Sequence, residues 1–284
     1  MHKRSQNLDD FGAGDQGLMF GYATDEWDQE TLHPLSHQLA NSLCEELAKV
    51  RHAGTIPWLR PDCKAQVILQ YTKEPSGRLV PLSIHTILIS TQHNPDVAPE
   101  TIRSVITEQI IKKVCPTELM KDDTRIIINP SGSFILGGPA ADTGLTGRKI
   151  IVDTYGGWAS HGGGAFSGKD PTKVDRSANY YARYVAKSLV AAGLCHRVCV
   201  QLSYAIGLPD PLSVYIDSYG SVKESLTDED LEDIVSKNFN FRPGNMIKEL
   251  NLLRPIYEKT AKYGAFGRRG DSDFTWECPK KLIL

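Results

Sequence analysis

The chain has 284 residues, of which 40% are hydrophobic and 23% are charged, and its formal net charge is −2. This length is enough for two domains with their own cores or for one large domain, and the composition is typical of a soluble globular protein. The small negative charge argues against a general nucleic-acid-binding protein. No hydrophobic run approaches the roughly eighteen residues that a membrane-spanning helix needs.

The N-terminal sequence MHKRSQNLDD is polar and lacks the apolar segment of a secretory signal. The cysteines form no Cys-x-x-Cys pair, and no histidine lies at the spacing of a metal site; they are Cys44, Cys63, Cys115, Cys195, Cys199 and Cys278. We therefore expect reduced cysteines, most of them buried, in a cytoplasmic protein.

In the first half of the chain, hydrophobic residues at helical spacing predict a helix from Pro34 to Arg51, which Gly54 ends. After a connector, alternating residues predict a strand over Gln66–Tyr71. A Ser-Gly turn separates it from a longer strand over Val80–Gln92. Pro99 then begins another helix with one hydrophobic face.

The second half repeats this order. A helix over Ser177–Ala192 is followed by a strand over Val198–Ile206, by a strand that begins with PLSVYI, and by a helix near Asp228–Phe239 with Thr227 as its cap. Because the second strand of each half begins with Pro-Leu-Ser, we interpret the halves as two copies of one helix–strand–strand–helix motif. The predicted fold is α+β, with mixed or antiparallel sheets that helices cover on one face.

A glycine-rich stretch, Asp153–Arg176, lies between the two copies. A strand-like run over Lys149–Tyr155 precedes it, a helix follows it, and Gly163–Lys169 has the G-x-x-x-x-G-K spacing of a phosphate-binding loop. Asp170 stands where that motif needs a hydroxyl for magnesium, so an ordinary NTPase site is excluded. An unusual polyphosphate site and a plain surface loop both stay open.

Charged residues also gather on the glycine-rich connectors instead of on helix faces. They are Asp15, Asp62, Lys64, Asp142, Arg148, Lys149, Lys169, Lys173 and Asp175. Cations on such backbone suit a nucleotide triphosphate, and carboxylates beside them suit magnesium or an amino group. For any one of these residues, a solvated surface charge is the alternative. Phe134 is a candidate for stacking on a base, or else a core residue.

Several long motifs resemble S-adenosylmethionine synthetase, that is, methionine adenosyltransferase. They are GAGDQGLMFGYA (Gly12–Ala23), LRPDCK (Leu59–Lys64), GLTGRKIIVDTYGG (Gly144–Gly157), HGGGAFSGKDPTKVDRS (His161–Ser177), QLSYAIG (Gln201–Gly207), FRPG (Phe241–Gly244) and PIYEKTAKYG (Pro255–Gly264). The resemblance runs from about Asp10 to Lys280. It implies a tail over residues 1–9, a central domain over 10–134 and a C-terminal domain over 135–284.

The resemblance also implies a reaction. The sulfur of methionine attacks C5′ of ATP and displaces the whole triphosphate, which is then hydrolysed to pyrophosphate and phosphate. Such catalysis depends on positioning and on cations that stabilise the leaving group. Magnesium and potassium are implied as cofactors, together with a homodimer or larger homo-oligomer that shares its active site. No nucleic-acid or membrane partner is implied.

The resemblance assigns roles to individual residues. The ATP-contacting set is Asp62, Cys63, Lys64, Ser131, Ser133, Phe134, Asp142, Arg148, Lys149, Ala165 and Lys169. Within it, the catalytic cations are Lys64, Arg148, Lys149 and Lys169. Methionine is assigned to Asp142, Lys173 and Asp15, and magnesium to Asp175.

The sequence also departs from the family. The family's first domain carries a Gly-His-Pro-Asp-Lys motif that these 284 residues do not contain, so residues 1–9 are interpreted as the cut end of that domain. Ser133 stands where the family has an arginine, and Ala265 where it has a histidine. Two functions therefore stay open: a methionine adenosyltransferase, and a truncated, non-catalytic isoform or paralogue that binds and modulates a full-length subunit.

Overall fold

The computed structural model describes residues 10–223 and 225–284, and the chain divides into two compact units. Unit 1 comprises Met1–Pro34, Lys73–Leu79 and Thr146–Leu284, described from Asp10 onward. Unit 2 comprises Leu35–Thr72 and Val80–Leu145. Each unit has a separate hydrophobic core.

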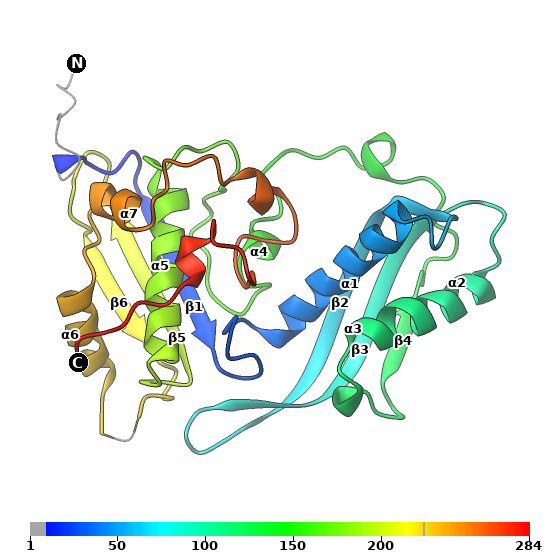
Figure 1. Cartoon of the computed structure of the whole chain (residues 1–284), viewed down its shortest axis with the longest axis horizontal. Coiled ribbons are helices and arrows are strands. Elements are labelled where there is room, and N and C mark those ends of the chain that lie inside the picture. The colour runs from blue at the N-terminus through cyan, green and yellow to red at the C-terminus, as the bar shows by residue number, and fades with distance from the viewer. Residues whose placement is uncertain (1–9, 224) are drawn as a thin grey trace. The chain divides into compact units, whose positions relative to one another are not determined.

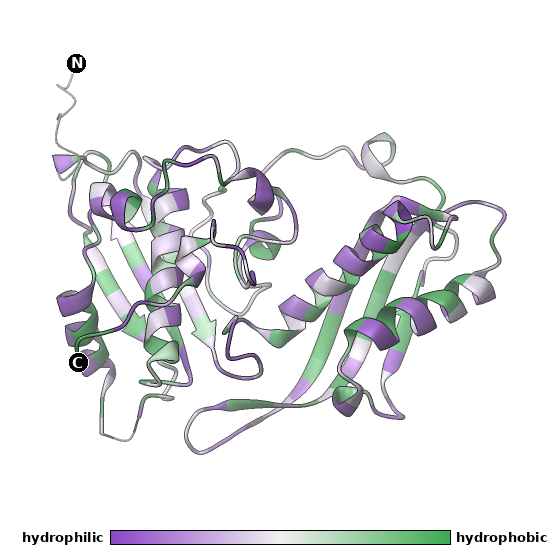
Figure 2. Cartoon of the chain, viewed as in Figure 1, coloured by the Kyte–Doolittle hydropathy of each residue, from purple (hydrophilic) through white to green (hydrophobic). Residues whose placement is uncertain are grey.

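Unit 2 is built on a sheet with the strand order β2-β3-β4, in which β4 runs parallel to β3. The strands are β2 (Leu59–Lys73), β3 (Leu79–His93) and β4 (Arg125–Ile128). Helix α1 (Leu35–His52) and helix α2 (Pro99–Ile106) pack on the sheet (Figure 1). Both helices alternate hydrophilic and hydrophobic residues (Figure 2), because only one side of each joins the core.

A π-helical turn over Thr107–Ile111 follows α2 and leads into the short helix α3 (Lys112–Val114). The expected hydrophobic face therefore does not continue as one regular helix. Within this turn, the adjacent residues Ile110 and Ile111 are both fully buried.

Helix α1 lies within one residue of its predicted bounds, and Gly54 ends it in a left-handed conformation with φ of +70°. Strand β2 was predicted too short: it begins at Leu59 and includes Asp62, Cys63 and Lys64, which were expected on a connector. Pro61 argued against a strand here, but β2 is at the edge of its sheet, where a missing N–H is tolerated.

Unit 1 is built on a second sheet with the order β1-β5-β6, in which both pairs are antiparallel. The strands are β1 (Gly17–Thr24), β5 (Arg197–Tyr204) and β6 (Ser213–Asp217). Helix α5 (Val174–Ala191) crosses β1 and β5 and is buried along almost its whole length (Figure 1). Helices α6 (Asp228–Asn238) and α7 (Pro243–Glu249) complete this unit. Thr227 caps α6, as predicted, and it forms a capping box with Asp230.

The α+β prediction is confirmed. The element order α1-β2-β3-α2 recurs as α5-β5-β6-α6, so the repeated motif is present in both units. Each sheet also has a third strand that was not predicted. Strand β1, from the start of the chain, pairs with β5 from Gly17 opposite Tyr204 to Thr24 opposite Arg197.

The strand predicted over Lys149–Tyr155 is wrong. These residues contain the short helix α4 (Ile150–Asp153). The Thr154 hydroxyl donates a hydrogen bond to the carbonyl of Ile150, and Gly156, with φ of +62°, closes the turn onto the carbonyl of Ile151. The β-branched residues suggested a strand, but no neighbouring strand pairs with them among the described residues, so local turn bonds prevail.

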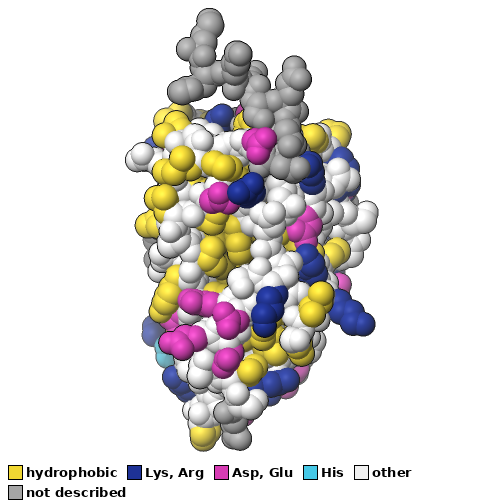
Figure 3. Space-filling model, turned by 90° about the vertical axis from the view of Figure 1, so that its left-hand side faces the viewer, with side chains coloured by type: hydrophobic (Ala, Val, Ile, Leu, Met, Phe, Trp, Pro, Cys, Tyr) yellow, Lys and Arg dark blue, Asp and Glu magenta, His cyan; other side chains and the backbone are white. Residues whose placement is uncertain are grey.

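The C-terminal segment packs through its aromatic residues. Trp276 is fully buried and stacks on Tyr180 with ring centroids 4.1 Å apart. The RGD sequence is engaged within the fold: Arg269 pairs with Asp28, and Asp271 pairs with Lys259. On the face shown in Figure 3, basic side chains are scattered among acidic and hydrophobic ones.

Candidate functional site

The centre of the candidate site in unit 1 is an ion pair between Lys169 and Asp175. The Lys169 Nζ lies 2.6 Å from Asp175 Oδ2, and both side chains are more than half buried. Lys169 comes from the glycine-rich loop and Asp175 from the first turn of α5. The fold therefore joins a predicted phosphate-binding cation and a predicted metal ligand in one pair.

The glycines of the loop give the Asp175 carboxylate its space. A Cβ atom on Gly164 would lie 2.1 Å from Asp175 Oδ1, and one on Gly17 would lie 3.3 Å from the same oxygen. Any side chain at residue 164 would displace the carboxylate from Lys169. At residue 164, the close approach of backbone and carboxylate therefore requires glycine.

Arg176 fixes the backbone of Lys169, and sequence reasoning missed this role. Its Nη1 donates a 2.8 Å hydrogen bond to the Lys169 carbonyl, and its guanidinium carbon lies 4.1 Å from the centroid of the Tyr257 ring. Arg176 is 5% exposed. One signal was present in the sequence: Arg176, Arg183 and Lys187 recur on a helix that is otherwise rich in alanine and tyrosine.

The predicted cations Arg148 and Lys149 are exposed, and neither forms an ion pair with another described residue. Their loop reaches the glycine-rich loop, since a Cβ on Gly147 would lie 2.6 Å from the Cβ of Ala165. The structure therefore brings Arg148 and Lys149 close to Ala165, a third member of the predicted ATP set. Free cations beside a backbone loop can bind a polyanion without first breaking an internal ion pair.

Two predicted methionine contacts come from segments that pack together. The turn over Gly12–Gly17 holds Asp15, which is exposed and accepts a hydrogen bond from the Gln16 N–H. A Cβ on Gly14 would lie 2.6 Å from the Thr172 carbonyl oxygen and 3.3 Å from Lys173 Cδ. The third candidate, Asp142, belongs to unit 2 and is exposed.

His161 is held in one tautomer by the same loop. Its Nδ1 accepts a 2.8 Å hydrogen bond from the Gly163 N–H, which leaves the proton of the neutral ring on Nε2. Burial lowers the pKa of His161 below its ordinary value, although the nearby charge of Asp175 works in the opposite direction. We therefore expect a neutral imidazole at pH 7.

In unit 2, Asp62 is held from both sides. Its Oδ2 accepts a 2.8 Å hydrogen bond from the Gly138 N–H, and its own N–H donates to the Gln92 side chain at 3.3 Å. A Cβ on Gly137 would lie 2.9 Å from Phe134 Cε2 and 3.0 Å from Asp62 Oδ2. Asp62 and Phe134, both predicted ATP contacts, therefore meet at Gly137, while Gln92 and Gly138 were missed.

Phe134 is half-buried and lies outside the core cluster of unit 2. It is therefore not a core residue, and its ring is accessible for stacking on a base. His93 holds its backbone: the His93 Nε2 accepts from the Phe134 N–H at 3.0 Å, and its Nδ1 lies 2.7 Å from the Asn94 carbonyl. Of the other predicted ATP contacts in this unit, Lys64, Ser131 and Ser133 are exposed and Cys63 is half-buried.

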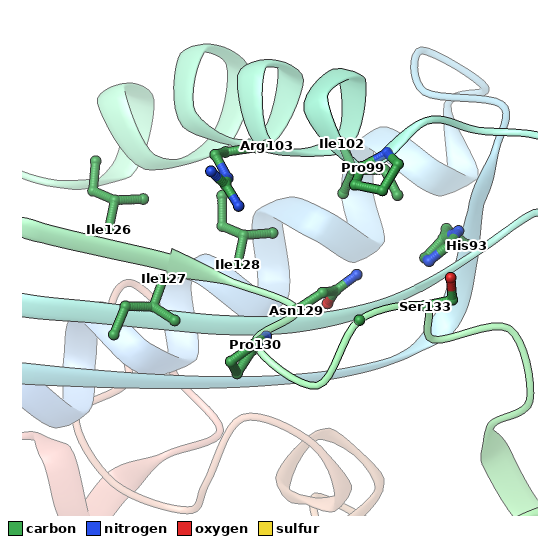
Figure 4. Close-up of a pocket in the computed structure, with 11 residues that line it drawn as sticks. His93, Pro99, Ile102, Arg103, Ile126, Ile127, Ile128, Asn129, Pro130 and Ser133 are labelled. Carbon is green, nitrogen blue, oxygen red and sulfur yellow. The ribbon is translucent and has the colours of Figure 1, made fainter.

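A cavity of about 350 Å³ lies beside this loop (Figure 4). Its lining combines hydrophobic residues of β4 and α2 with polar groups, and Ser133 and His93 lie at one end. Arg103 extends from α2 toward Ile128 on the opposite side. The loop that carries Phe134 therefore has open space behind it instead of tightly packed core.

The sequence matches two protein-family models over most of its length. Residues 10–134 match the S-adenosylmethionine synthetase central domain, and residues 136–278 match the S-adenosylmethionine synthetase C-terminal domain. The chain belongs to the S-adenosylmethionine synthetase family. The resemblance found in the motifs is thus confirmed. The compact units follow a different division, because β1, which falls within the central-domain match, completes the sheet of unit 1.

The S-adenosylmethionine synthetase family implies the use of ATP with metal ions. No cluster of three or more His, Cys, Asp or Glu suited to a metal occurs within residues 10–223 and 225–284. Magnesium is commonly bound by one or two carboxylates together with substrate phosphates and water. Asp175, whose Oδ1 faces glycines, fits a site of that kind. Throughout these same residues, no helix is long and hydrophobic enough to cross a membrane.

Proposed function

We propose that this chain acts as a methionine adenosyltransferase, which makes S-adenosylmethionine from ATP and L-methionine and cleaves the triphosphate to pyrophosphate and phosphate. The observation that carries the proposal is the Lys169–Asp175 pair, held by a glycine-rich loop at the start of α5 in a chain of the S-adenosylmethionine synthetase family. A lysine and a metal-binding carboxylate side by side suit a substrate that carries several negative charges.

In this proposal, the cations stabilise the triphosphate leaving group. When methionine sulfur attacks C5′, negative charge develops on the oxygen that leaves with the triphosphate. Arg148 and Lys149 are exposed and have no internal ion pair within the described chain, so they are available to bind phosphate oxygens. Lys169 is held in place before substrate binds. Positioned cations of this kind stabilise the developing charge without further reorganisation.

The remaining candidates orient the two substrates. Phe134 is half-exposed and would stack on adenine, and Asp62, fixed by Gly138, would accept a hydrogen bond from the nucleoside. Lys173 would pair with the methionine carboxylate, while Asp15 and Asp142 would receive its amino group. Lys64, Cys63, Ser131, Ser133 and Ala165 complete the proposed ATP contacts.

Magnesium, bound by Asp175 and the phosphates, would neutralise part of the triphosphate charge. Potassium, a homo-oligomer with a shared site, a cytoplasmic location and the domain boundary after residue 134 remain parts of the proposal that rest on the family resemblance. None of the residues described above is assigned to potassium.

The proposal is tested by measuring product and ligand binding in parallel. The purified chain is mixed with ATP, methionine, magnesium and potassium, and S-adenosylmethionine is detected by mass spectrometry. Tripolyphosphate binding is measured by calorimetry. We expect Lys169→Ala to weaken tripolyphosphate binding by about 10-fold to 100-fold, the scale of a lost hydrogen bond to a charged group.

Lys112→Ala is the matched control, because Lys112 is an exposed lysine of unit 2 that pairs with Glu108, whereas Lys169 belongs to unit 1. It should leave tripolyphosphate affinity unchanged. Equal affinities of the Lys169→Ala variant and the unmodified chain, or no detectable binding of tripolyphosphate to either, would count against the proposed site.

A further inference from the structure

The cavity beside the loop that carries Phe134 has the size of a site for a small ligand. Its volume is about 350 Å³, and ligand pockets range from roughly 300 to 1,000 Å³. Ser133 is the only member of the proposed ATP set that lines it, and Phe134 itself does not. The proposed function therefore leaves most of this cavity without a role.

Hydrophobic side chains from two elements face each other across the cavity. Ile126 and Ile128 lie on the same face of β4 and point toward α2 (Figure 4). Pro99 and Ile102, from the start of α2, lie on the opposite side. Such a surface gains free energy by removing the hydrocarbon part of a ligand from water.

The turn that follows β4 holds its wall of the cavity in place. The Asn129 side chain accepts a 2.8 Å hydrogen bond from the Thr91 N–H and donates a 3.1 Å hydrogen bond to the Thr91 carbonyl. The Gly132 N–H donates to the Asn129 carbonyl at 3.0 Å. Because this wall is ordered before any ligand arrives, binding does not have to include the cost of ordering it.

Two polar groups of the lining remain available to a ligand. Arg103 is exposed, extends into the cavity from α2 (Figure 4), and forms no ion pair with any residue of 10–223 or 225–284. The Ser133 hydroxyl makes no hydrogen bond within the same ranges. Both ring nitrogens of His93, in contrast, are already engaged. None of the lining residues is acidic, so a negative group beside Arg103 meets no competing carboxylate of the lining.

We propose that this cavity binds a small organic carboxylate with a hydrophobic body. The Arg103 guanidinium pairs with the carboxylate, since its planar fork matches the two oxygens. Ser133 donates a further hydrogen bond, and the hydrocarbon part packs on Ile126 and Ile128. A single negative charge is the best match, because Arg103 is the only lysine or arginine of the lining. The inference goes beyond the proposed transferase activity and does not require it.

The experiment uses phenylpropionate as the probe and heteronuclear NMR of the isotope-labelled full chain as the readout. We expect saturable binding with a dissociation constant of about 1 mM or lower, as suits a ligand of this size. The amide resonances of Asn129, Gly132 and Ser133 should shift. That of Phe134 should shift too, because its N–H donates to His93 in the cavity lining.

Phenylpropanol, which has the same body without the charge, should bind about tenfold more weakly or less, the scale of a lost hydrogen bond to a charged group. Arg103→Gln should weaken phenylpropionate binding by a similar factor of about ten. The amide spectrum of this variant away from the cavity shows whether its fold is unchanged, as expected for an exposed residue of α2.

Arg125→Gln is the matched control, because Arg125 is an exposed arginine of β4 that does not line the cavity. It should bind the probe as the unmodified chain does. Equal affinities of Arg103→Gln and the unmodified chain, or resonance shifts confined to residues outside the cavity, would overturn the proposal. The absence of saturable shifts at up to about 10 mM probe would also overturn it. These outcomes are independent of tripolyphosphate binding at Lys169, which is measured separately.

Discussion

Arg176 is a buried side chain that holds the backbone of the candidate functional residue Lys169. It donates to the Lys169 carbonyl and to Tyr180, and its guanidinium packs on the Tyr257 ring. The arginine therefore fixes where the Lys169 loop ends, while the Lys169 side chain remains directed at Asp175.

We expect Arg176→Met to weaken tripolyphosphate binding by about tenfold, equivalent to about 1.4 kcal/mol, because the Lys169 backbone loses a charge-assisted hydrogen bond. Calorimetry at a temperature where both proteins are folded gives the affinity. Arg176→Lys keeps the charge without the planar fork and should recover only part of it. Unchanged affinity in Arg176→Met would show that the loop is held by other contacts.

Glu277 is the centre of a buried charge network. It accepts hydrogen bonds from Arg183 and Lys187 at 2.9 and 2.8 Å and from the Gly267 N–H at 2.9 Å. Burial raises the pKa of Glu277, but the charges of Arg183 and Lys187 more than offset this, so the pKa lies below its ordinary value of 4.5. Burial lowers the pKa of Lys187. The guanidinium of Arg183 stays charged, so Arg183 is the cation that stabilises the Glu277 carboxylate.

Because the pKa of Glu277 is lower in the folded than in the unfolded chain, its carboxylate stabilises the fold above about pH 4.5 and this stability is lost as the pH falls below that value. We expect Glu277→Gln to lower the free energy of unfolding at pH 7 by about 3–5 kcal/mol. Its unfolding free energy should also depend less on acid than that of the unmodified chain. Urea titrations at several pH values between 3 and 7 measure both effects, because this range includes the pH at which the Glu277 carboxylate loses its charge in the unfolded chain.

Glu45→Gln, at an exposed position of α1, should change neither quantity. An equal acid dependence in Glu277→Gln and the unmodified chain would mean that other carboxylates set the acid response.

At the scale of elements, the contact between β1 and α5 is closer than ordinary side chains permit. Gly21 lies in β1, and a Cβ there would be 2.0 Å from the carbonyl oxygen of Ala182 and 2.7 Å from the backbone nitrogen of Arg183. Both obstacles are backbone atoms of a buried helix, which cannot move aside as a flexible side chain could.

We expect Gly21→Ala to lower the free energy of unfolding by about 3 kcal/mol through this overlap. Gly144→Ala is the control, since no atom lies within 4 Å of a Cβ there, and it should change stability by no more than about 0.5 kcal/mol. Chemical denaturation compares the two. Equal stabilities of both variants would mean that α5 can shift on the sheet.

At the scale of the whole molecule, the chain order and the compact units do not coincide. The residues of β1 come first in the described chain, yet they pair with β5 and pack on α5 in unit 1. Unit 2 comes from the part of the chain between β1 and α5, except that the hairpin tip Lys73–Leu79 belongs to unit 1.

Removal of residues 1–34 should therefore affect the two units differently. We expect amide hydrogens of β5, such as those of Val200 and Leu202, to exchange faster than in the full chain, because β5 loses one of its two partner strands and α5 loses part of its support. Amides of β3, such as that of Ile87, should stay protected, since the core of unit 2 contains no residue before Leu35. Hydrogen exchange with mass spectrometry measures both; full protection of β5 would contradict the expectation.

The sequence by itself determined the features that depend on neighbours along the chain. The leucine spacing of α1, Gly54 at its end and Thr227 before α6 are local signals, and each matches the structure. The family was also evident from the glycine-rich motifs, and the domain matches confirm it. Turns, caps and helical periodicity act within a few residues, so they can be recognised without tertiary structure.

Only the tertiary structure decided which distant segments meet. It pairs β1 with β5, turns Ile150–Asp153 into a helix, and extends β2 through Pro61. It also joins Lys169 to Asp175 and assigns Arg176 to the Lys169 backbone. These outcomes depend on burial and on partners far away in the sequence, and such contacts override local preference wherever the two disagree.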